Sequence, residues 1–176
     1  MQISEPLHQA LTLTEAAYLA GMIDADGTIT LTKTKNNSRN TSYIYPKVMI
    51  YNTNENLMKW IVSKLGGKYI ISVKKGHGKA KKDCYRYDVY GREKQIAFLE
   101  KIIPFMIIKK DRATLVKKYL EKRQAKLDRP LIKIRPDRGQ FFRKTLRHTP
   151  YDKEDWNIMN QVKTLNQGGN TYAHSS

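Results

Sequence analysis

The chain has 176 residues, enough for one domain or for one domain and a tail, and 33 Lys and Arg against 16 Asp and Glu give it a formal charge of +17. Residues 106–147 alone hold 15 basic and four acidic side chains, a cluster typical of proteins that bind a polyanion. The single cysteine, Cys84, excludes an internal disulfide framework and a thiolate-rich zinc site. The sequence shows no long apolar run, no signal peptide and no basic amphipathic segment, so we expect no membrane partner.

The first third of the chain predicts a helix, two strands and a second helix. Thr12 followed by Glu15 forms a capping box, so a helix is expected to begin there, to continue through Ile23 and to end at Gly27. Alternating apolar and polar residues then predict two strands, and an apolar stripe at helical spacing predicts a helix. These three elements are expected at Thr28–Lys35, Tyr43–Asn52 and Asn54–Leu65.

The remaining residues predict a hairpin with a basic tip, followed by helices. The hairpin strands are Lys68–Lys75 and Asp83–Tyr90. Helices are expected at 91–103, 111–123 and 153–165, an extended basic stretch at 124–149 and a disordered tail at 166–176.

This order predicts an α+β fold: a saddle-shaped antiparallel sheet in the order αββαββα, with helices on one face. The expected divisions are a lead-in at 1–11, the domain at 12–123, a basic extension with a short helix at 124–165, and the tail. One face of the sheet would carry Ile, Val and Leu. The other would carry Thr, Tyr, Lys, Ser and Arg, which can hydrogen-bond to base edges, and a twisted ribbon fits the major groove of DNA.

Two acids stand where the first helix is expected to end. The negative pole of the helix dipole lies there, so Asp24 and Asp26 break a local rule in a basic chain. Residues two apart on a helix point in different directions, so we expect one carboxylate to bond the adjacent backbone and the other to face outward. The alternative is a simple polar turn. An EF-hand calcium loop is excluded, because Gly27 comes too early and Ile29 replaces a ligand.

Small residues four apart, Ala16 to Ala20 and Ala17 to Gly21, predict a smooth helix face that another helix can approach closely. If the partner is the same helix of a second chain, two outward carboxylates meet at the symmetry axis and need a cation. Mg²⁺ prefers carboxylate oxygens and suits phosphodiester chemistry. The dimer interface is therefore expected at Ala17, Ala20 and Gly21.

The stretch YLAGMIDADGTI (Tyr18–Ile29) resembles the signature of the LAGLIDADG homing endonucleases, with Met22 in place of a consensus Leu. PFMIIKKDRA (Pro104–Ala113) resembles a later segment of that family, and the resemblance covers about Thr12–Arg123. MNQVKTLN, near the end of the chain, is similar to late helices of some members. Members with one motif act as homodimers and members with two act as monomers, so this chain, with one motif, is expected to dimerise.

The resemblance also assigns site residues. It implies that Asp26 and the carbonyl of Ala25 hold Mg²⁺, and that Asp24 ties down the helix end. It places Lys109 near the scissile phosphate, with Lys110 as the alternative, and Asn52 where a polar residue positions water. Lys109 and Lys110 could instead be solvated or contact phosphates, and Asn52 could be a turn residue.

The polar sheet face is expected to read the DNA sequence, since Arg pairs with guanine and Asp accepts from cytosine. Similar faces also occur on sheets without a ligand. The candidate DNA-binding residues are Thr30, Thr32, Thr34, Asn36, Tyr45, Lys47, Ser72, Lys74, Arg86 and Asp88.

The resemblance therefore predicts a homodimeric, Mg²⁺-dependent endonuclease that makes a double-strand break with short 3′ overhangs in a long pseudo-palindromic DNA target. We expect an intron-encoded or freestanding gene, and a protein that acts inside the cell, in a bacterial or phage cytoplasm or an organelle, on the DNA of the encoding genome. One alternative is an RNA-binding maturase that assists its host intron RNA. A transcription regulator is disfavoured, because no helix-turn-helix is evident after Gln124.

Overall fold

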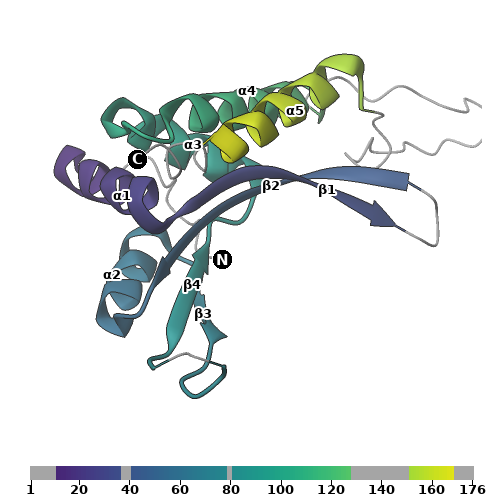
Figure 1. Ribbon diagram of the computed structural model, residues 1–176. Coiled ribbons are helices and arrows are strands. Elements are labelled where there is room, and N and C mark those ends of the chain that lie inside the picture. The colour runs from purple at the N-terminus through teal and green to yellow at the C-terminus, as the bar shows by residue number, and fades with distance from the viewer. Residues whose placement is uncertain (1–10, 37–40, 79–80, 128–150, 169–176) are drawn as a thin grey trace, which may run out of the picture.

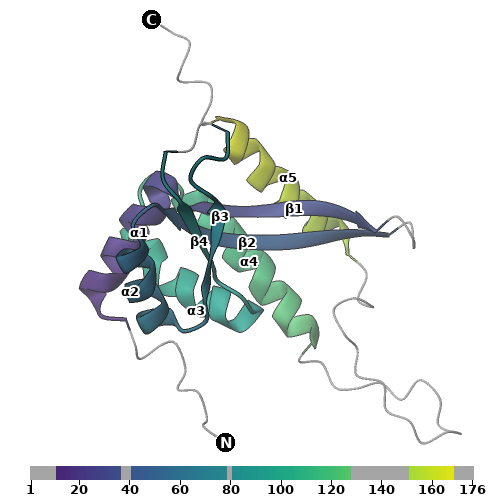
Figure 2. The ribbon, with the colours of Figure 1, turned by 90° about the horizontal axis from the view of Figure 1, so that it is seen from below.

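A computed structural model describes residues 11–36, 41–78, 81–127 and 151–168, and it confirms the predicted α+β fold. The sheet has four antiparallel strands in the order β1-β2-β4-β3. Helices lie on the convex side of this curved sheet (Figure 1), and from below no helix crosses in front of β1 and β2 (Figure 2). The elements are α1 (Leu13–Asp26), β1 (Thr28–Asn36), β2 (Thr41–Asn52), α2 (Glu55–Leu65), β3 (Tyr69–Val73), β4 (Cys84–Asp88), α3 (Arg92–Ile102), η3 (Ile103–Phe105), α4 (Lys110–Leu127) and α5 (Lys153–Gly168).

Both ends of α1 follow from local chemistry. The hydroxyl of Thr12 accepts a hydrogen bond from the Glu15 N–H at 3.2 Å, and the Glu15 carboxylate accepts one from the Thr12 N–H at 2.9 Å, so the predicted capping box is confirmed. Gly27 ends the helix with an ordinary φ of −79°. The position needs glycine for space, since a Cβ there would lie 2.6 Å from the Cα of Ile23.

The two hairpins of the sheet differ greatly in length. β1 pairs with β2 along its whole length, from Thr28 opposite Met49 to Asn36 opposite Thr41. β4 pairs only with the last part of β2, Met49–Asn52. The first half of β2 therefore has an open edge on the side away from β1.

One core joins all the helices to the convex face of the sheet. The apolar residues alternate along β1 and β2, so Val48 and Ile50 point into the core, as expected for a sheet face of Ile, Val and Leu, while Tyr45 is exposed. Within the part of the chain that the structure describes, no helix is long and apolar enough to cross a membrane. The largest fully buried apolar side chains are those of Leu19, Ile23, Ile29, Val48, Ile50, Met58, Ile61, Phe98, Leu99, Ile102 and Leu120.

The last helix belongs to this core, which corrects the predicted domain boundary at Arg123. α4 continues as a helix to Leu127, so residues 124–127 are helical and not extended. α5 contributes Ile158 and Val162 to the core and extends beyond the expected end at residue 165. The predictions for residues 1–10, 128–149 and 169–176 concern segments outside the described residues.

Ion pairs fasten α5 to α4. Arg123 is 1% exposed, and its guanidinium lies 3.4 Å from the carboxylate of Asp155, whose side chain is fully buried. Lys122 and Lys126 bond Asp152, and together they hold the pKa of that carboxyl well below its usual range. Much of the basic charge of α4 is therefore neutralised within the chain and is not available to an external polyanion.

Replacing Gly27 by alanine is predicted to destabilise the fold, because the new methyl group would overlap the backbone of Ile23. Overpacking of this kind costs about 1–3 kcal/mol, measurable by urea unfolding. Ala25→Gly, which removes an exposed methyl group near the same helix end, is the matched control and should cost no more than about 1 kcal/mol. Equal stabilities of the two variants would contradict the steric argument.

Candidate functional site

Asp24 joins the end of α1 to the start of α4. Its carboxylate accepts hydrogen bonds from the backbone N–H groups of Ile107, Ile108 and Lys109, at 2.6, 3.2 and 2.9 Å. These groups lie 83 to 85 residues away in sequence. One acid therefore bonds backbone N–H groups as expected, but these belong to a distant segment and not to the adjacent backbone. The N-terminus of α4 begins there, and its dipole favours the carboxylate that the end of α1 disfavours.

Lys109 completes this junction in the opposite direction. Its ammonium donates to the carbonyl oxygens of Ile23, Ala25 and Gly27, at 2.6, 3.3 and 2.9 Å. Carbonyls at a helix C-terminus lack partners within the helix, and a cation there also offsets the negative pole. The same residue thus bonds Asp24 through its backbone and the end of α1 through its side chain.

The charge on Lys109 is set by competing neighbours. Burial lowers its pKa, and the nearby Arg112 lowers it further, while Asp24 and Asp26 act in the opposite direction. The three carbonyl hydrogen bonds also favour the ammonium form. This lysine can therefore supply a fixed positive charge beside the end of α1.

Asp26 differs from Asp24 in every respect that bears on ligands. It is exposed, and among the described residues its carboxylate accepts no hydrogen bond and forms no ion pair. The described part of the chain holds no group of three or more His, Cys, Asp or Glu side chains that could bind a metal. The carboxylate of Asp26 and the carbonyl of Ala25 offer oxygen ligands, which Mg²⁺ prefers. They are too few to complete a metal site without oxygens from another molecule.

Asn52 is the last residue of β2, pairs with Tyr85 of β4, and makes a local turn through its side chain. Its side-chain oxygen accepts from the Asn54 N–H at 2.8 Å, and Asn54 in turn caps α2. The turn interpretation of Asn52 is therefore correct for its oxygen. Among the described residues its NH₂ group donates to no protein group.

Burial separates the three predicted interface residues. Ala20 is fully buried in the core of its own chain, so it cannot form a surface for a second chain, and that prediction is corrected. Gly21 is exposed, and a Cβ added to it would meet nothing within 4 Å. Ala17 is half-buried four residues earlier on the same face of α1.

Exposed apolar side chains flank that face and were missed from the sequence. Leu13, at the start of α1, is 75% exposed, and Ile107 and Ile108, whose N–H groups hold Asp24 at its end, are 87% and 76% exposed. The sequence signal for this exposed apolar surface was the pair Ile107-Ile108, directly before the charged start of α4. Its meaning depends on the fold, because a sequence alone does not tell a buried isoleucine from an exposed one.

The register brings most of the predicted DNA-binding residues onto one face. Thr30 lies opposite Lys47, and Thr32 lies opposite Tyr45, whose carbonyl accepts from the Thr32 hydroxyl at 3.3 Å. Thr34 belongs to the same face, at the distal end of the long hairpin. Asn36 ends β1, and its side chain lies outside the described part.

On the shorter hairpin the predicted face is less uniform. Arg86 bonds Asp88 through Nε at 3.0 Å, and Ile70, opposite Arg86, is 41% exposed on this otherwise polar face. The Ser72 hydroxyl donates to the Cys84 carbonyl, so it is partly used within the sheet. Lys74 was predicted to lie on the third strand. It lies beyond the end of β3, so this prediction is wrong.

α5 adds a residue that sequence reasoning missed. The Asn166 amide donates to the Thr30 hydroxyl at 3.0 Å, and the neighbouring Leu165 carbonyl accepts from Arg112. The last turn of α5 therefore lies at the edge of the polar face, close to the start of α4. No local pattern could indicate a contact between residues 136 positions apart.

Comparisons with known proteins agree with this fold. The family profile described as "LAGLIDADG-like domain" matches residues 14–103, whereas a search of curated protein sequences finds no match. The homing endonuclease I-CvuI, solved in complex with its target, is similar over 88% of this chain and 96% of that chain, at a TM-score of 0.51 and 19% identity.

Two longer solved proteins show the same fold over about half of their length. I-GzeII, a LAGLIDADG homing endonuclease in complex with a DNA target, matches 85% of this chain and 43% of that chain, at a TM-score of 0.54 and 14% identity. A lysine-to-alanine mutant of I-SmaMI matches 93% of this chain and 47% of that chain, at a TM-score of 0.55 and 17% identity.

Lys109→Met is predicted to destabilise the protein by about 1–3 kcal/mol, because three carbonyls at the end of α1 lose a charged donor. Lys110→Met, which removes an exposed ammonium one residue later, should change stability by no more than about 0.5 kcal/mol. Urea unfolding of both variants measures the difference. Equal effects would mean that the helix end does not depend on Lys109.

Proposed function

The chain belongs to the LAGLIDADG homing endonuclease family, and from this membership and the arrangement of its two motif acids we propose that it is a Mg²⁺-dependent, site-specific double-strand DNA endonuclease that acts as a homodimer. The observation that carries the proposal is the division of labour at the end of α1. The Asp24 carboxylate accepts hydrogen bonds from three backbone N–H groups. The Asp26 carboxylate is exposed and has no hydrogen-bond or ion-pair partner among the described residues.

An exposed carboxylate fixed on a rigid helix end is suited to bind a cation. The junction with α4 fixes the backbone around Asp26, so little entropy is lost when its oxygens are used. Mg²⁺ held by Asp26 and the carbonyl of Ala25 would supply Lewis-acid stabilisation of phosphate charge and a water of lowered pKa. The further oxygens that the site needs would come from the DNA phosphate and from Asp26 of a second chain.

Lys109 would contribute positive charge beside the same helix end. Its ammonium lies 3.3 Å from the carbonyl of Ala25, so it is placed to stabilise charge that develops on a phosphate bound there. Asn52 would position water through its NH₂ group, since its oxygen is bonded to Asn54.

The polar sheet face would read the target. Arg86 uses Nε to bond Asp88, which orients the guanidinium and leaves its two terminal NH₂ groups for a bidentate contact with guanine. Thr30, Thr32, Tyr45 and Lys47 would contact bases or phosphates along the long hairpin. Two copies related by a two-fold axis would then recognise a pseudo-palindromic site.

Homodimerisation is supported by what α1 exposes. Glycine within an exposed helix costs about 1 kcal/mol relative to alanine, and none of the described residues lies within 4 Å of a Cβ added at Gly21. A helix of a second chain would need that space. The apolar side chains of Leu13, Ile107 and Ile108 at the two ends of α1 would be covered by the same partner.

The alternative function is an RNA-binding maturase with the same fold. A pure binder has no need of an unpaired carboxylate at Asp26, so this residue favours cleavage, whereas Lys109 also holds the end of α1 and does not separate the two functions. No helix-turn-helix follows α4 in the described residues, where α5 stands alone, and a regulator therefore has no support.

Asp26→Asn is predicted to retain DNA binding and to lose cleavage. Wild type and variant would be used side by side to select sites from a randomised DNA library in Mg²⁺, with Ca²⁺ for binding. Wild type should enrich one roughly palindromic cleaved site, and the variant should bind that site uncut. Cleavage by the variant would remove Asp26 from the mechanism, and absence of cleavage by wild type would favour the maturase.

Gly21→Leu is predicted to weaken the dimer about tenfold or more without unfolding the chain, because the side chain has open space in one chain and none against a close helix. Ser63→Leu adds the same side chain to the exposed face of α2 and is the matched control. Sedimentation over a range of protein concentrations measures both. A Gly21→Leu dimer as tight as wild type would place the interface elsewhere.

A further inference from the structure

Arg112 is a cation at the unfavourable end of its helix. It lies in the first turn of α4, where the pole of the helix dipole is positive. Lys109 lies three residues earlier on the same side, since the Ala113 N–H bonds the Lys109 carbonyl in the pattern of an α-helix. Two neighbouring cations at a positive pole break a local rule, as the acids at the end of α1 do, and such violations tend to mark functional sites.

The Arg112 guanidinium is only partly satisfied within the chain. Its Nη2 donates at 3.0 Å to the carbonyl of Leu165, in the last turn of α5, where carbonyls lack a partner within the helix. This bond lies in an exposed position, so the outer end of the guanidinium can be reached from solvent. The Nε is buried and has no hydrogen-bond partner, and among the described residues Nη1 has no acceptor and no acid pairs with Arg112.

Partial burial makes this arrangement costly. Burial lowers the pKa of Arg112, because the charged form loses water and gains no counter-charge among the described residues. Arg112 in turn lowers the pKa of Lys109, which shows that the two charges are close enough to repel each other. An anion bound beside them would relieve both costs.

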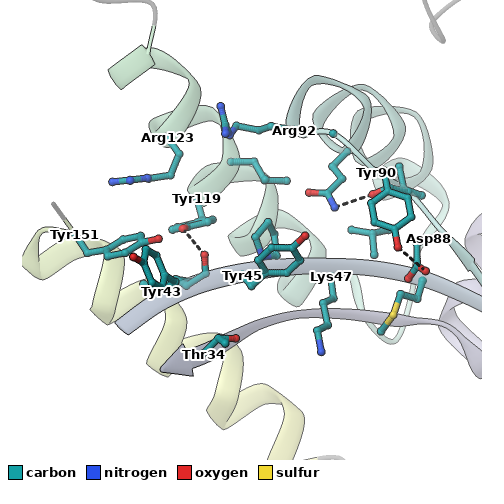
Figure 3. A pocket seen from close by; sticks show the side chains of 18 of the residues that line it. Thr34, Tyr43, Tyr45, Lys47, Asp88, Tyr90, Arg92, Tyr119, Arg123 and Tyr151 are labelled. Atoms are coloured by element: carbon teal, nitrogen blue, oxygen red, sulfur yellow. Dashed lines mark hydrogen bonds between the residues drawn. The ribbon is translucent and has the colours of Figure 1, made fainter. Parts of the chain in front are cut away.

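The cations farther along α4 do not share this property. Arg123, for example, pairs with Asp155 and lies 4.5 Å over the ring of Tyr151, where Figure 3 shows it. Lys110 is exposed to water, which can hydrate its charge. Among the described cations of α4, Arg112 is therefore the one that is half-buried without a carboxylate. The cations that pair with an acid are Lys117, Lys118, Lys122, Arg123 and Lys126.

Lys109 already uses all of its hydrogen-bond donors. An ammonium has three N–H groups, and those of Lys109 are directed to the carbonyls of Ile23, Ala25 and Gly27. Lys109 can contribute its positive field, but a bond to a phosphate would break one of these contacts at the end of α1. Charge that develops on a phosphate oxygen is stabilised best by donors held in a fixed position. Arg112, one helical turn further on, keeps N–H groups for that purpose.

The last turn of α5 places Arg112 at the edge of the proposed DNA face. Leu165 bonds Arg112, and the next residue, Asn166, donates to the hydroxyl of Thr30 at 3.0 Å. Thr30 belongs to the polar face of β1 and follows Asp26 by four residues. Two adjacent residues of α5 thus connect Arg112 with the first part of the DNA-reading strand, beside the end of α1.

We propose that the Arg112 guanidinium donates a hydrogen bond to the DNA phosphate at the cleavage site, and that the last turn of α5 positions it there. The inference rests on the proposed endonuclease function, because the phosphate is the one that Asp26 and its cation would hold. Arginine suits this role, since its planar group can keep one N–H on the Leu165 carbonyl while another binds a phosphate oxygen.

The first experiment measures binding and needs no cleavage. Fluorescence anisotropy follows the affinity of the full chain for the DNA site selected in Ca²⁺, in EDTA and over a range of KCl concentrations. The loss of one phosphate contact lowers the slope of log K against log salt by about 0.9, so Arg112→Met should lower it by that amount for each bound chain. Lys118→Met, the matched control, removes an exposed cation that pairs with Glu154 and should leave the slope unchanged.

The second experiment measures cleavage in Mg²⁺ at saturating protein, in a single turnover. Arg112→Met should cut about a hundredfold more slowly than wild type, as for the removal of one positioned donor. Arg112→Lys keeps the charge, so it should keep the salt slope and recover the rate only in part, because an ammonium lacks the planar fork. Asn166→Ala leaves Arg112 intact but loosens its support, and should slow cleavage about tenfold at an unchanged salt slope.

The two readouts separate this proposal from the proposed function. An unchanged salt slope for Arg112→Met would overturn the phosphate contact, whether or not the wild type cleaves. A lower slope with a wild-type rate would move the contact to a phosphate outside the cleavage site and would also overturn the proposal. A wild type that binds DNA but never cuts it would refute the endonuclease, and the slope would still decide whether Arg112 contacts a phosphate. Urea unfolding checks that each variant is folded, and Arg112→Lys serves if Arg112→Met is not.

Discussion

The reciprocal contact between Asp24 and Lys109 is the interaction on which the rest of the site depends. Asp24, at the end of α1, accepts from three N–H groups that precede α4, and Lys109, at the start of α4, donates to three carbonyls at the end of α1. The end of α1 and the turn that leads into α4 thus bond each other in both directions, and opposite dipole poles meet. This pairing explains why a basic chain places acids at the negative end of a helix.

This junction has consequences on both sides of α1. Because Asp24 is saturated, Asp26 becomes the one motif acid that remains available to a ligand, on a backbone that two helices and β1 hold in place. The turn that supplies the N–H groups also carries Ile107 and Ile108 into solvent beside α1. The same contact therefore presents the proposed metal ligand and part of the proposed dimer surface.

Charge is distributed less simply than the composition suggests. Lys122, Arg123 and Lys126 in α4 are paired with acids of α5, so they stabilise the fold and contribute little field outside it. The groups available to nucleic acid lie on β2 and around it. One side of that strand carries Tyr45 and Lys47 on the proposed DNA surface.

The sequence by itself determined the order and type of the elements, since periodicity, the Thr12–Glu15 capping box and the glycine at residue 27 are local signals. It also identified the motif and hence the family. Only the tertiary structure decided which partner Asp24 bonds, that Ala20 is buried while Gly21 is exposed, that α4 runs past Arg123, and that Asn166 reaches Thr30. These facts depend on which residues distant in sequence pack together, and no pattern within one segment contains that information.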